Sequence, residues 1–229
     1  FYDLMGSITY LTVIWFTLMS SSNESTLTNI GNIVIVLLIS SWAIRLGTFL
    51  FLRIKKDGED KRFRTIKPSA SRFFMTWTLQ GLWVSLCSMC ALTAISSESG
   101  IILNLFFYVG VAIFIFGFAI EIIADNQKSK FRSIEANKNS FITTGLWAKS
   151  RHPNYLGEIL LWLGVAVISF SSLSGWQYLT LISPIFTYLL LVYVSGVRML
   201  EERGEKKWGH NEEYIKYKST TPRLFFNLK

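Results

Sequence analysis

SRHPNYLGEILLWLGVAVISF, residues 150–170, joins a polar segment directly to an apolar one. The polar part includes an arginine, a histidine, an asparagine and a glutamate, whereas residues 159–170 are almost entirely apolar. The apolar part predicts a helix that crosses a membrane, and Pro153 suits its first turn because the missing N–H is not needed there. The polar residues at this threshold therefore either cap the helix among lipid headgroups or hold a polar ligand at the membrane edge.

The composition of the whole chain is typical of a membrane protein. Of its 229 residues, 51% are hydrophobic and only 17% are charged. A soluble helical protein would need polar faces at helical spacing, and the long apolar runs lack them. We predict an all-α, polytopic helical membrane protein with a single membrane-embedded domain over residues 1–229. The six predicted transmembrane helices lie at about 4–20, 31–52, 73–96, 101–124, 156–171 and 176–197.

The basic residues indicate the same topology. All but one of the 23 Lys and Arg residues lie in segments 53–72, 125–155 and 198–229, which six alternating helices place on one face of the membrane. The loops expected on the opposite face contain no Lys or Arg: 21–30, 97–100 and 172–175. We expect both visible termini on the basic face and, because the chain starts with Phe1, a further segment upstream. The endoplasmic reticulum, the mitochondrial inner membrane and the bacterial inner membrane are not distinguished.

The net charge of +8 has a simple explanation in the membrane itself. Basic residues that flank membrane helices interact with anionic headgroups, so we predict membrane lipids and not nucleic acid as partners. Cys87 and Cys90 lie inside a predicted span and are interpreted as packing residues. The sequence has no zinc-binding, P-loop or GxGxxG motif, and we predict no metal.

Ionisable residues within the predicted helices are the next signal, because an unpaired charge in hydrocarbon costs several kcal/mol. Arg45 lies inside the second predicted helix, where it either snorkels to the surface or serves a function. Glu121 and Asp125 are four residues apart, and Lys128 and Arg132 continue the same helical face. A solvated helix end accounts for the two cations more easily than for Glu121.

The motif in residues 150–158 has the same two interpretations. Asn154 and Glu158 lie on one helical face, either as a polar cap or as ligand-binding groups. Together with the residues above they are expected at the basic face, where cations suit phosphates, carboxylates suit ribose hydroxyls and apolar walls suit a lipid. This chemistry fits a dinucleotide bound outside a Rossmann fold. The polar residues expected there are Arg45, Glu121, Asp125, Arg132, Arg151, His152, Asn154, Tyr155, Glu158, Arg198, Glu201 and Glu202.

Three stretches carry a resemblance to a known family: EIIADNQKSKFR, GLWAKSRHPNYLGEILLWLG and SGVRMLEERGEKKWGHNEEYIKYKSTTPRLF. The chain resembles the membrane-embedded steroid 5α-reductase superfamily, closest to its little-characterised bacterial and eukaryotic branch. The resemblance implies seven transmembrane helices, one more than the six predicted here, so that the first helix of the family would be lacking from this chain. It also implies bound NADPH and the transfer of a hydride to the β-carbon of an enone in a sterol or other lipid.

The resemblance also implies roles for particular residues. Asp125, Arg132, Asn154 and Glu158 match cofactor-contacting positions, and Arg45 matches a position in the early helices. The full set predicted to bind NADPH is Arg45, Glu121, Asp125, Arg132, Arg151, His152, Asn154, Tyr155, Glu158 and Glu202.

The predicted catalytic residues depart from the steroid enzymes. Asp3 is the nearest match to the glutamate that polarises the substrate carbonyl, and Trp42 occupies the position of its tyrosine partner. An indole N–H donates a hydrogen bond but does not readily give up a proton. We therefore expect reduction of another enone lipid, with Asp3, Tyr2 or water as the acid.

Two alternatives remain open at this point. Isoprenylcysteine carboxyl methyltransferases are more distant relatives that use RHPxY and a later Glu-Glu pair for S-adenosylmethionine, and this chain has RHPNY and Glu201-Glu202. The other alternative is a non-catalytic, reductase-like subunit of a membrane complex. The segment ADNQKSKFR and the pair Asn154 and Glu158 favour NADPH.

Overall fold

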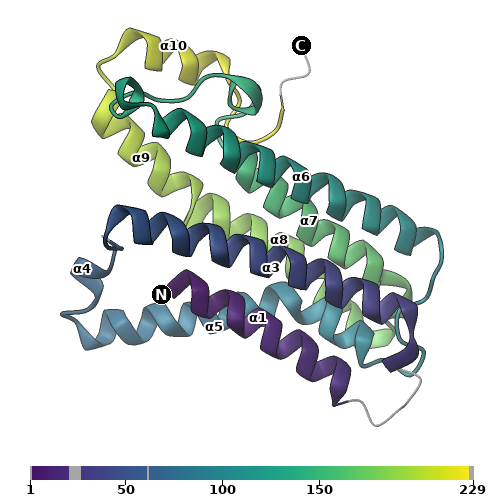
Figure 1. Ribbon diagram of the computed structural model, residues 1–229. Coiled ribbons are helices and arrows are strands. Elements are labelled where there is room, and N and C mark those ends of the chain that lie inside the picture. The colour runs from purple at the N-terminus through teal and green to yellow at the C-terminus, as the bar shows by residue number, and fades with distance from the viewer. Residues whose placement is uncertain (1, 21–26, 61, 227–229) are drawn as a thin grey trace. The chain divides into compact units, whose positions relative to one another are not determined.

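A computed structural model describes residues 2–20, 27–60 and 62–226, and these residues form helices without any strand (Figure 1). The longer helices are α1 (Tyr2–Met19), α3 (Ile30–Asp57), α5 (Ala70–Ile95), α6 (Leu105–Ser133), α7 (Pro153–Ser169), α8 (Ser183–Leu189), α9 (Val197–Trp208) and α10 (Glu212–Thr220). Short elements connect them: α4 (Phe63–Ile66), η1 (Glu135–Asn137), η2 (Gly145–Ala148), η3 (Phe170–Ser172), η4 (Gly175–Ile182) and η5 (Leu190–Val194).

Five helical segments among the described residues are long and apolar enough to cross a membrane, which confirms a helical membrane protein. They are Ile30–Lys56, Ala70–Ile95, Leu105–Ser133, Pro153–Ser172 and Gly175–Trp208. Their outward side chains are apolar and exposed, as at Phe74, Leu105 and Trp176, which is the pattern expected where lipid is the solvent. The first predicted span coincides with α1, an 18-residue helix that is not among the five. A sixth crossing therefore stays a prediction.

The start of α6 differs from the prediction. The apolar run was expected to become helical at residue 101, but the helix begins at Leu105. Asn104 explains the later start, because its side-chain oxygen accepts a hydrogen bond from the backbone N–H of Phe107 at 3.3 Å and so satisfies a helix terminus. Before it, the backbone N–H of Ile101 donates to the side-chain oxygen of Asn32 at 2.9 Å.

The chain divides into two compact units, of which the first comprises residues 1–110 and 165–183. Small residues allow its helices to approach closely: a Cβ added to Gly47 would lie 2.6 Å from the Ser7 hydroxyl. Cys87 and Cys90 are fully buried free thiols in this unit, as expected for packing residues. The Ser183 hydroxyl donates to the Cys87 carbonyl oxygen at 2.5 Å.

The second unit comprises residues 111–164 and 184–229 and contains the motif of residues 150–158. Its helices α6 and α7 touch through two glycines. A Cβ added to Gly117 would lie 2.6 Å from the Gly157 carbonyl oxygen, and one added to Gly157 would lie 2.7 Å from the Glu121 backbone nitrogen. Contact between the two backbones therefore sets the register of α6 on α7.

The last predicted span, 176–197, is not one continuous α-helix. It consists of the 3₁₀ segment η4, the α-helix α8 and the π-helical turn η5, and it ends before Gly196. A Cβ at Gly196 would lie 2.5 Å from the Leu191 carbonyl oxygen, so the tight path at this point requires glycine. The helix α9 then starts at Val197 with its own helical phase.

Candidate functional site

The segment 145–152 reaches its position because it is attached to α6. Gly145 adopts φ +64°, which favours glycine, and lets the chain turn. The Leu146 backbone N–H then donates to the Gln127 side-chain oxygen at 2.9 Å, and the Trp147 indole N–H donates to the Ala124 carbonyl oxygen at 3.0 Å. The loop before α7 is therefore held on the basic end of α6.

The C-terminal tail holds the same loop from another side. The Ser150 hydroxyl donates to the Leu224 carbonyl oxygen at 2.7 Å, and the Arg151 backbone N–H donates to the Pro222 carbonyl oxygen at 2.9 Å. The Tyr217 hydroxyl donates to the Trp147 carbonyl oxygen at 2.6 Å. Burial raises the pKa of Tyr217, more than Arg151 lowers it, so its hydroxyl stays a donor at neutral pH.

Glu201 on α9 connects the first two residues of RHPNY. One carboxylate oxygen, Oε1, lies 2.7 Å from His152 Nε2, and the other, Oε2, lies 2.8 Å from Arg151 NH1. The side chains are only 7%, 13% and 19% exposed for His152, Arg151 and Glu201. Burial lowers the pKa of His152, although Glu201 acts in the opposite direction, and Lys128 and Arg151 add to the lowering.

Three further carboxylates are buried in the same unit. Glu121 and Asp125 of α6 are 2% and 6% exposed, and Glu158 of α7 is 6% exposed. The close approach at Gly157 brings the Glu158 region of α7 to Glu121, because Gly157 precedes Glu158 and its α-carbon lies against the Glu121 backbone. Three carboxylates kept away from solvent in one unit form a polar centre that apolar packing alone does not require.

Polar atoms at the start of α7 also lack partners. His152 Nδ1, Asn154 Oδ1, Arg151 Nε and Arg151 NH1 are buried and have no hydrogen bond within the described part of the chain, although NH1 lies in ion-pair contact with Glu201. A buried group left without a hydrogen bond costs about 1–3 kcal/mol. His152 Nδ1 and Asn154 Oδ1 can accept hydrogen bonds, and the Arg151 guanidinium can donate them. Such groups within four residues suit a ligand that has both hydroxyl or amide groups and phosphates.

The remaining predicted cofactor residues of this unit differ in their exposure and in their contacts with the loop. The Tyr155 ring stacks on His152 with 6.0 Å between ring centroids. Lys128, the cation between Asp125 and Arg132 on the predicted stripe, lies 4.2 Å from the Trp147 ring centroid. Arg132 is exposed near the end of α6. Glu202 points elsewhere: it is 57% exposed and pairs with Arg198 at 3.0 Å.

The predicted residues of the first unit make other contacts. Asp3 pairs with Arg62 at 2.6 Å, and the Tyr2 hydroxyl donates to the Thr76 carbonyl oxygen at 3.0 Å. The Asp3 carboxylate therefore accepts a hydrogen bond from Arg62 in this arrangement.

The other two predicted residues of this unit both lie on α3. Trp42 is 2% exposed and packs edge-on against Tyr10 at 5.1 Å. Arg45 is half-buried, and its guanidinium lies 5.2 Å from the Phe49 ring centroid. The roles of Tyr2, Asp3, Trp42 and Arg45 stay predictions.

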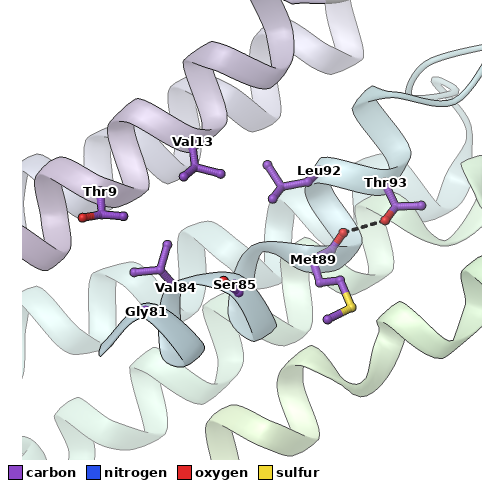
Figure 2. Close-up of a pocket in the computed structure, with 8 residues that line it drawn as sticks. All are labelled: Thr9, Val13, Gly81, Val84, Ser85, Met89, Leu92 and Thr93. Carbon is purple, nitrogen blue, oxygen red and sulfur yellow. Dashed lines mark hydrogen bonds between the residues drawn. The ribbon is translucent and has the colours of Figure 1, made fainter. Parts of the chain in front are cut away.

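The first unit also contains an apolar pocket of about 450 Å³ (Figure 2). Thr9 and Val13 of α1 line one side, and the other side is formed by α5 with Gly81, Val84, Ser85, Met89, Leu92 and Thr93. The Thr93 hydroxyl is turned to its own helix, where it donates to the Met89 carbonyl oxygen at 2.9 Å. The pocket therefore presents mainly hydrocarbon.

The sequence did not predict that Glu201 contacts both Arg151 and His152. The prediction placed Glu201 and Glu202 together at the basic face and selected Glu202 for the cofactor, whereas Glu201 makes both contacts to RHPNY. Ser150 and Tyr217 were not selected either, although each anchors the loop. Neighbouring residues of a helix point in directions about 100° apart. The rotation of α9 about its axis therefore decides which of Glu201 and Glu202 faces the RHPNY loop.

These observations define the class of the protein as a helical integral membrane protein with a buried polar centre. The chain belongs to the family described as proteins of unknown function DUF1295, which it matches over residues 1–221. No curated protein and no solved structure matches the chain.

Proposed function

We propose that this protein is an NADPH-dependent reductase that reduces the C=C bond of an enone in a lipid or sterol-like substrate. The observation that carries the proposal is the polar centre of the second unit, which contains the buried carboxylates Glu121, Asp125 and Glu158 and the RHPNY loop with its largely buried Arg151 and His152. Resemblance of the same segments to the steroid 5α-reductase superfamily supports the assignment of the cofactor.

The residues of the polar centre fit the chemistry of a dinucleotide. Arg151, Lys128 and Arg132 are the cations that would hold its phosphates, and Asp125 and Glu158 are acceptors for ribose hydroxyls. His152 Nδ1 and Asn154 Oδ1 are buried without hydrogen bonds among the described residues, so each has capacity left for a ligand. When bound, NADPH supplies the hydride that reaches the β-carbon, and an acid supplies the proton for the α-carbon.

The substrate side of the proposal rests on the first unit. The apolar pocket of about 450 Å³ along α1 and α5 has a volume suited to the hydrocarbon of a lipid. Tyr2 keeps an O–H group, whereas Asp3 is ion-paired with Arg62. We therefore favour Tyr2 over Asp3 as the proton donor.

A methyltransferase that uses S-adenosylmethionine is the second candidate. The specific observation in its favour is the contact of Glu201 with Arg151 and His152, because it joins the two motifs that the chain shares with isoprenylcysteine carboxyl methyltransferases. In that contact one Glu201 oxygen is hydrogen-bonded to His152 and the other is ion-paired with Arg151, which leaves less capacity for a ligand and favours the reductase.

Calorimetric titration of the detergent-solubilised protein with NADPH, and separately with S-adenosylmethionine, tests these assignments. Micromolar NADPH binding that Glu158→Gln weakens at least tenfold, while Glu202→Gln leaves it unchanged, supports the reductase. Glu202 is the matched control because it loses the same charge on an exposed face. Binding of S-adenosylmethionine alone favours the methyltransferase, and binding of neither ligand to folded protein favours a non-catalytic subunit of a membrane complex.

A further inference from the structure

Glu201 uses both of its carboxylate oxygens on the RHPNY loop. Oε1 lies 2.7 Å from His152 Nε2, and Oε2 lies 2.8 Å from Arg151 NH1. A carboxylate accepts hydrogen bonds and cannot donate them. The nitrogen of His152 that faces Glu201 must therefore carry a hydrogen atom.

The protonation state of His152 determines what its second ring nitrogen can do. Burial lowers the pKa of His152, so the ring is neutral at neutral pH and carries one hydrogen atom. With that hydrogen on Nε2, the other nitrogen, Nδ1, has a lone pair and accepts. Nδ1 is buried and has no hydrogen bond to any described residue.

We propose that Glu201 is a positioning residue that fixes His152 in the Nε2–H tautomer, so that Nδ1 accepts a hydrogen bond from an O–H or N–H group of the bound dinucleotide. The identity of the ligand rests on the proposed function, whereas the tautomer does not. Asn154 Oδ1, two residues along, is a second buried acceptor that faces no described partner. His152 Nδ1 and Asn154 Oδ1 thus offer two acceptors to the ligand at the start of α7. The phosphates of the ligand would be bound by the cations of the polar centre.

Glu201→Gln changes this arrangement with almost no change in size. A glutamine whose amide oxygen faces the Arg151 cation, as Oε2 of Glu201 does, turns its NH₂ group toward His152 Nε2. Nε2 must then accept, and the hydrogen atom moves to Nδ1, which becomes a donor. Glu202→Gln removes the same charge one residue away, on a side chain that is 57% exposed and paired with Arg198.

The first test measures the tautomer without any ligand. The chain has only two histidines, so long-range ¹H–¹⁵N spectra of ¹⁵N-histidine-labelled protein contain two ring systems, and His210→Gln identifies the signals of His152. We expect a protonated Nε2 and a bare Nδ1 in the wild type and in Glu202→Gln, and the reverse in Glu201→Gln. A wild-type ring with Nδ1–H, or a ring that Glu201→Gln leaves unchanged, overturns the proposal.

The second test measures NADPH affinity by titration. We expect Glu201→Gln to weaken binding about tenfold or more, because a donor replaces a buried acceptor, and Glu202→Gln to change it less than twofold. His152→Asn can place its amide oxygen where Nδ1 lies, so it should keep most of the affinity and make binding insensitive to Glu201→Gln. His152→Gln reaches Nε2 instead and should lose affinity like Glu201→Gln.

The two tests fail in different ways. If Glu201→Gln weakens binding equally in the His152→Asn background, Glu201 does not act through His152 and the proposal is overturned. If the tautomers are as expected but the wild type binds no NADPH, the proposed function and the ligand contact of Nδ1 are overturned, while Glu201 stands as the residue that sets the tautomer.

Discussion

Replacement of Gly157 by alanine tests the packing that places the polar centre. The added Cβ would lie 2.6 Å from the Gly117 carbonyl oxygen and 2.7 Å from the Glu121 backbone nitrogen. Ordinary contacts of a Cβ begin near 3.4 Å, so α6 and α7 must separate by about 0.8 Å. The clash is with backbone atoms, which cannot rotate away as a side chain would.

We expect this separation to destabilise the protein by about 1–3 kcal/mol, the range found for overpacked cores. It also moves Glu121 away from α7, so NADPH affinity should fall together with stability. Thermal unfolding in detergent, followed by tryptophan fluorescence, measures the first effect, and titration measures the second. Gly81→Ala is the matched control, because it adds the same methyl group to a membrane helix at a position with nothing within 4 Å.

An unfolding temperature of Gly157→Ala equal to that of Gly81→Ala would refute the reasoning, since it would mean that α6 and α7 are not in backbone contact at this point. A lower unfolding temperature with unchanged NADPH affinity would confirm the packing but separate it from ligand binding. The two readouts therefore test the geometry and its functional consequence independently.

Three further predictions concern the contacts around the two units. Burial lowers the pKa of His152 below its value in the unfolded chain, so the unfolded state binds a proton first as the pH falls. The free energy of unfolding should therefore decrease as the pH drops below about 6.5. The unfolding temperatures at pH 7.5 and 5.5 should differ less in His152→Asn than in the wild type. Tyr217→Phe removes the hydroxyl that donates to the Trp147 carbonyl oxygen at 2.6 Å. It should lower the free energy of unfolding by about 0.5–1.5 kcal/mol. Equal denaturation midpoints of the variant and the wild type would contradict this expectation. Arg62→Met removes two ion pairs, to Asp3 and to Asp60, each at 2.6 Å and with the arginine 40% exposed. Because solvent screens such pairs, each should contribute no more than about 1 kcal/mol to the unfolding free energy, and a loss above about 2 kcal/mol in the same assay would show that the pairs act as if buried.

The apolar runs of the sequence predicted five of the membrane helices well because hydrocarbon thickness fixes how long such runs must be. The positions where helices start were less predictable. Residues 101–104 continue an apolar run, but Asn104 caps the helix that follows and Ile101 bonds to Asn32, a residue far away in the sequence. Hydropathy cannot reveal such long-range hydrogen bonds.

The polar centre was predictable in its composition and less so in its connections. Glu121, Asp125 and Glu158 were selected because charges inside apolar helices require a reason, and all three are buried. The anchors Ser150 and Tyr217 were not selected, because their partners are backbone carbonyl oxygens of the tail and the loop. A backbone acceptor leaves no mark on the sequence, since every residue has one.

The choice between Glu201 and Glu202 shows why helical phase limits prediction from sequence. A π-helical turn forms i→i+5 hydrogen bonds and so accommodates one more residue than an α-helical turn, which shifts all later side chains by about 100°. The turn η5 and the break at Gly196 lie directly before α9, so the helical phase of α9 does not follow from that of the apolar run. In the protein Glu201 faces Arg151 and His152, whereas Glu202 is exposed beside Arg198. The irregular end of the last span is therefore one reason why the sequence alone does not identify Glu201 as the residue that contacts the RHPNY loop.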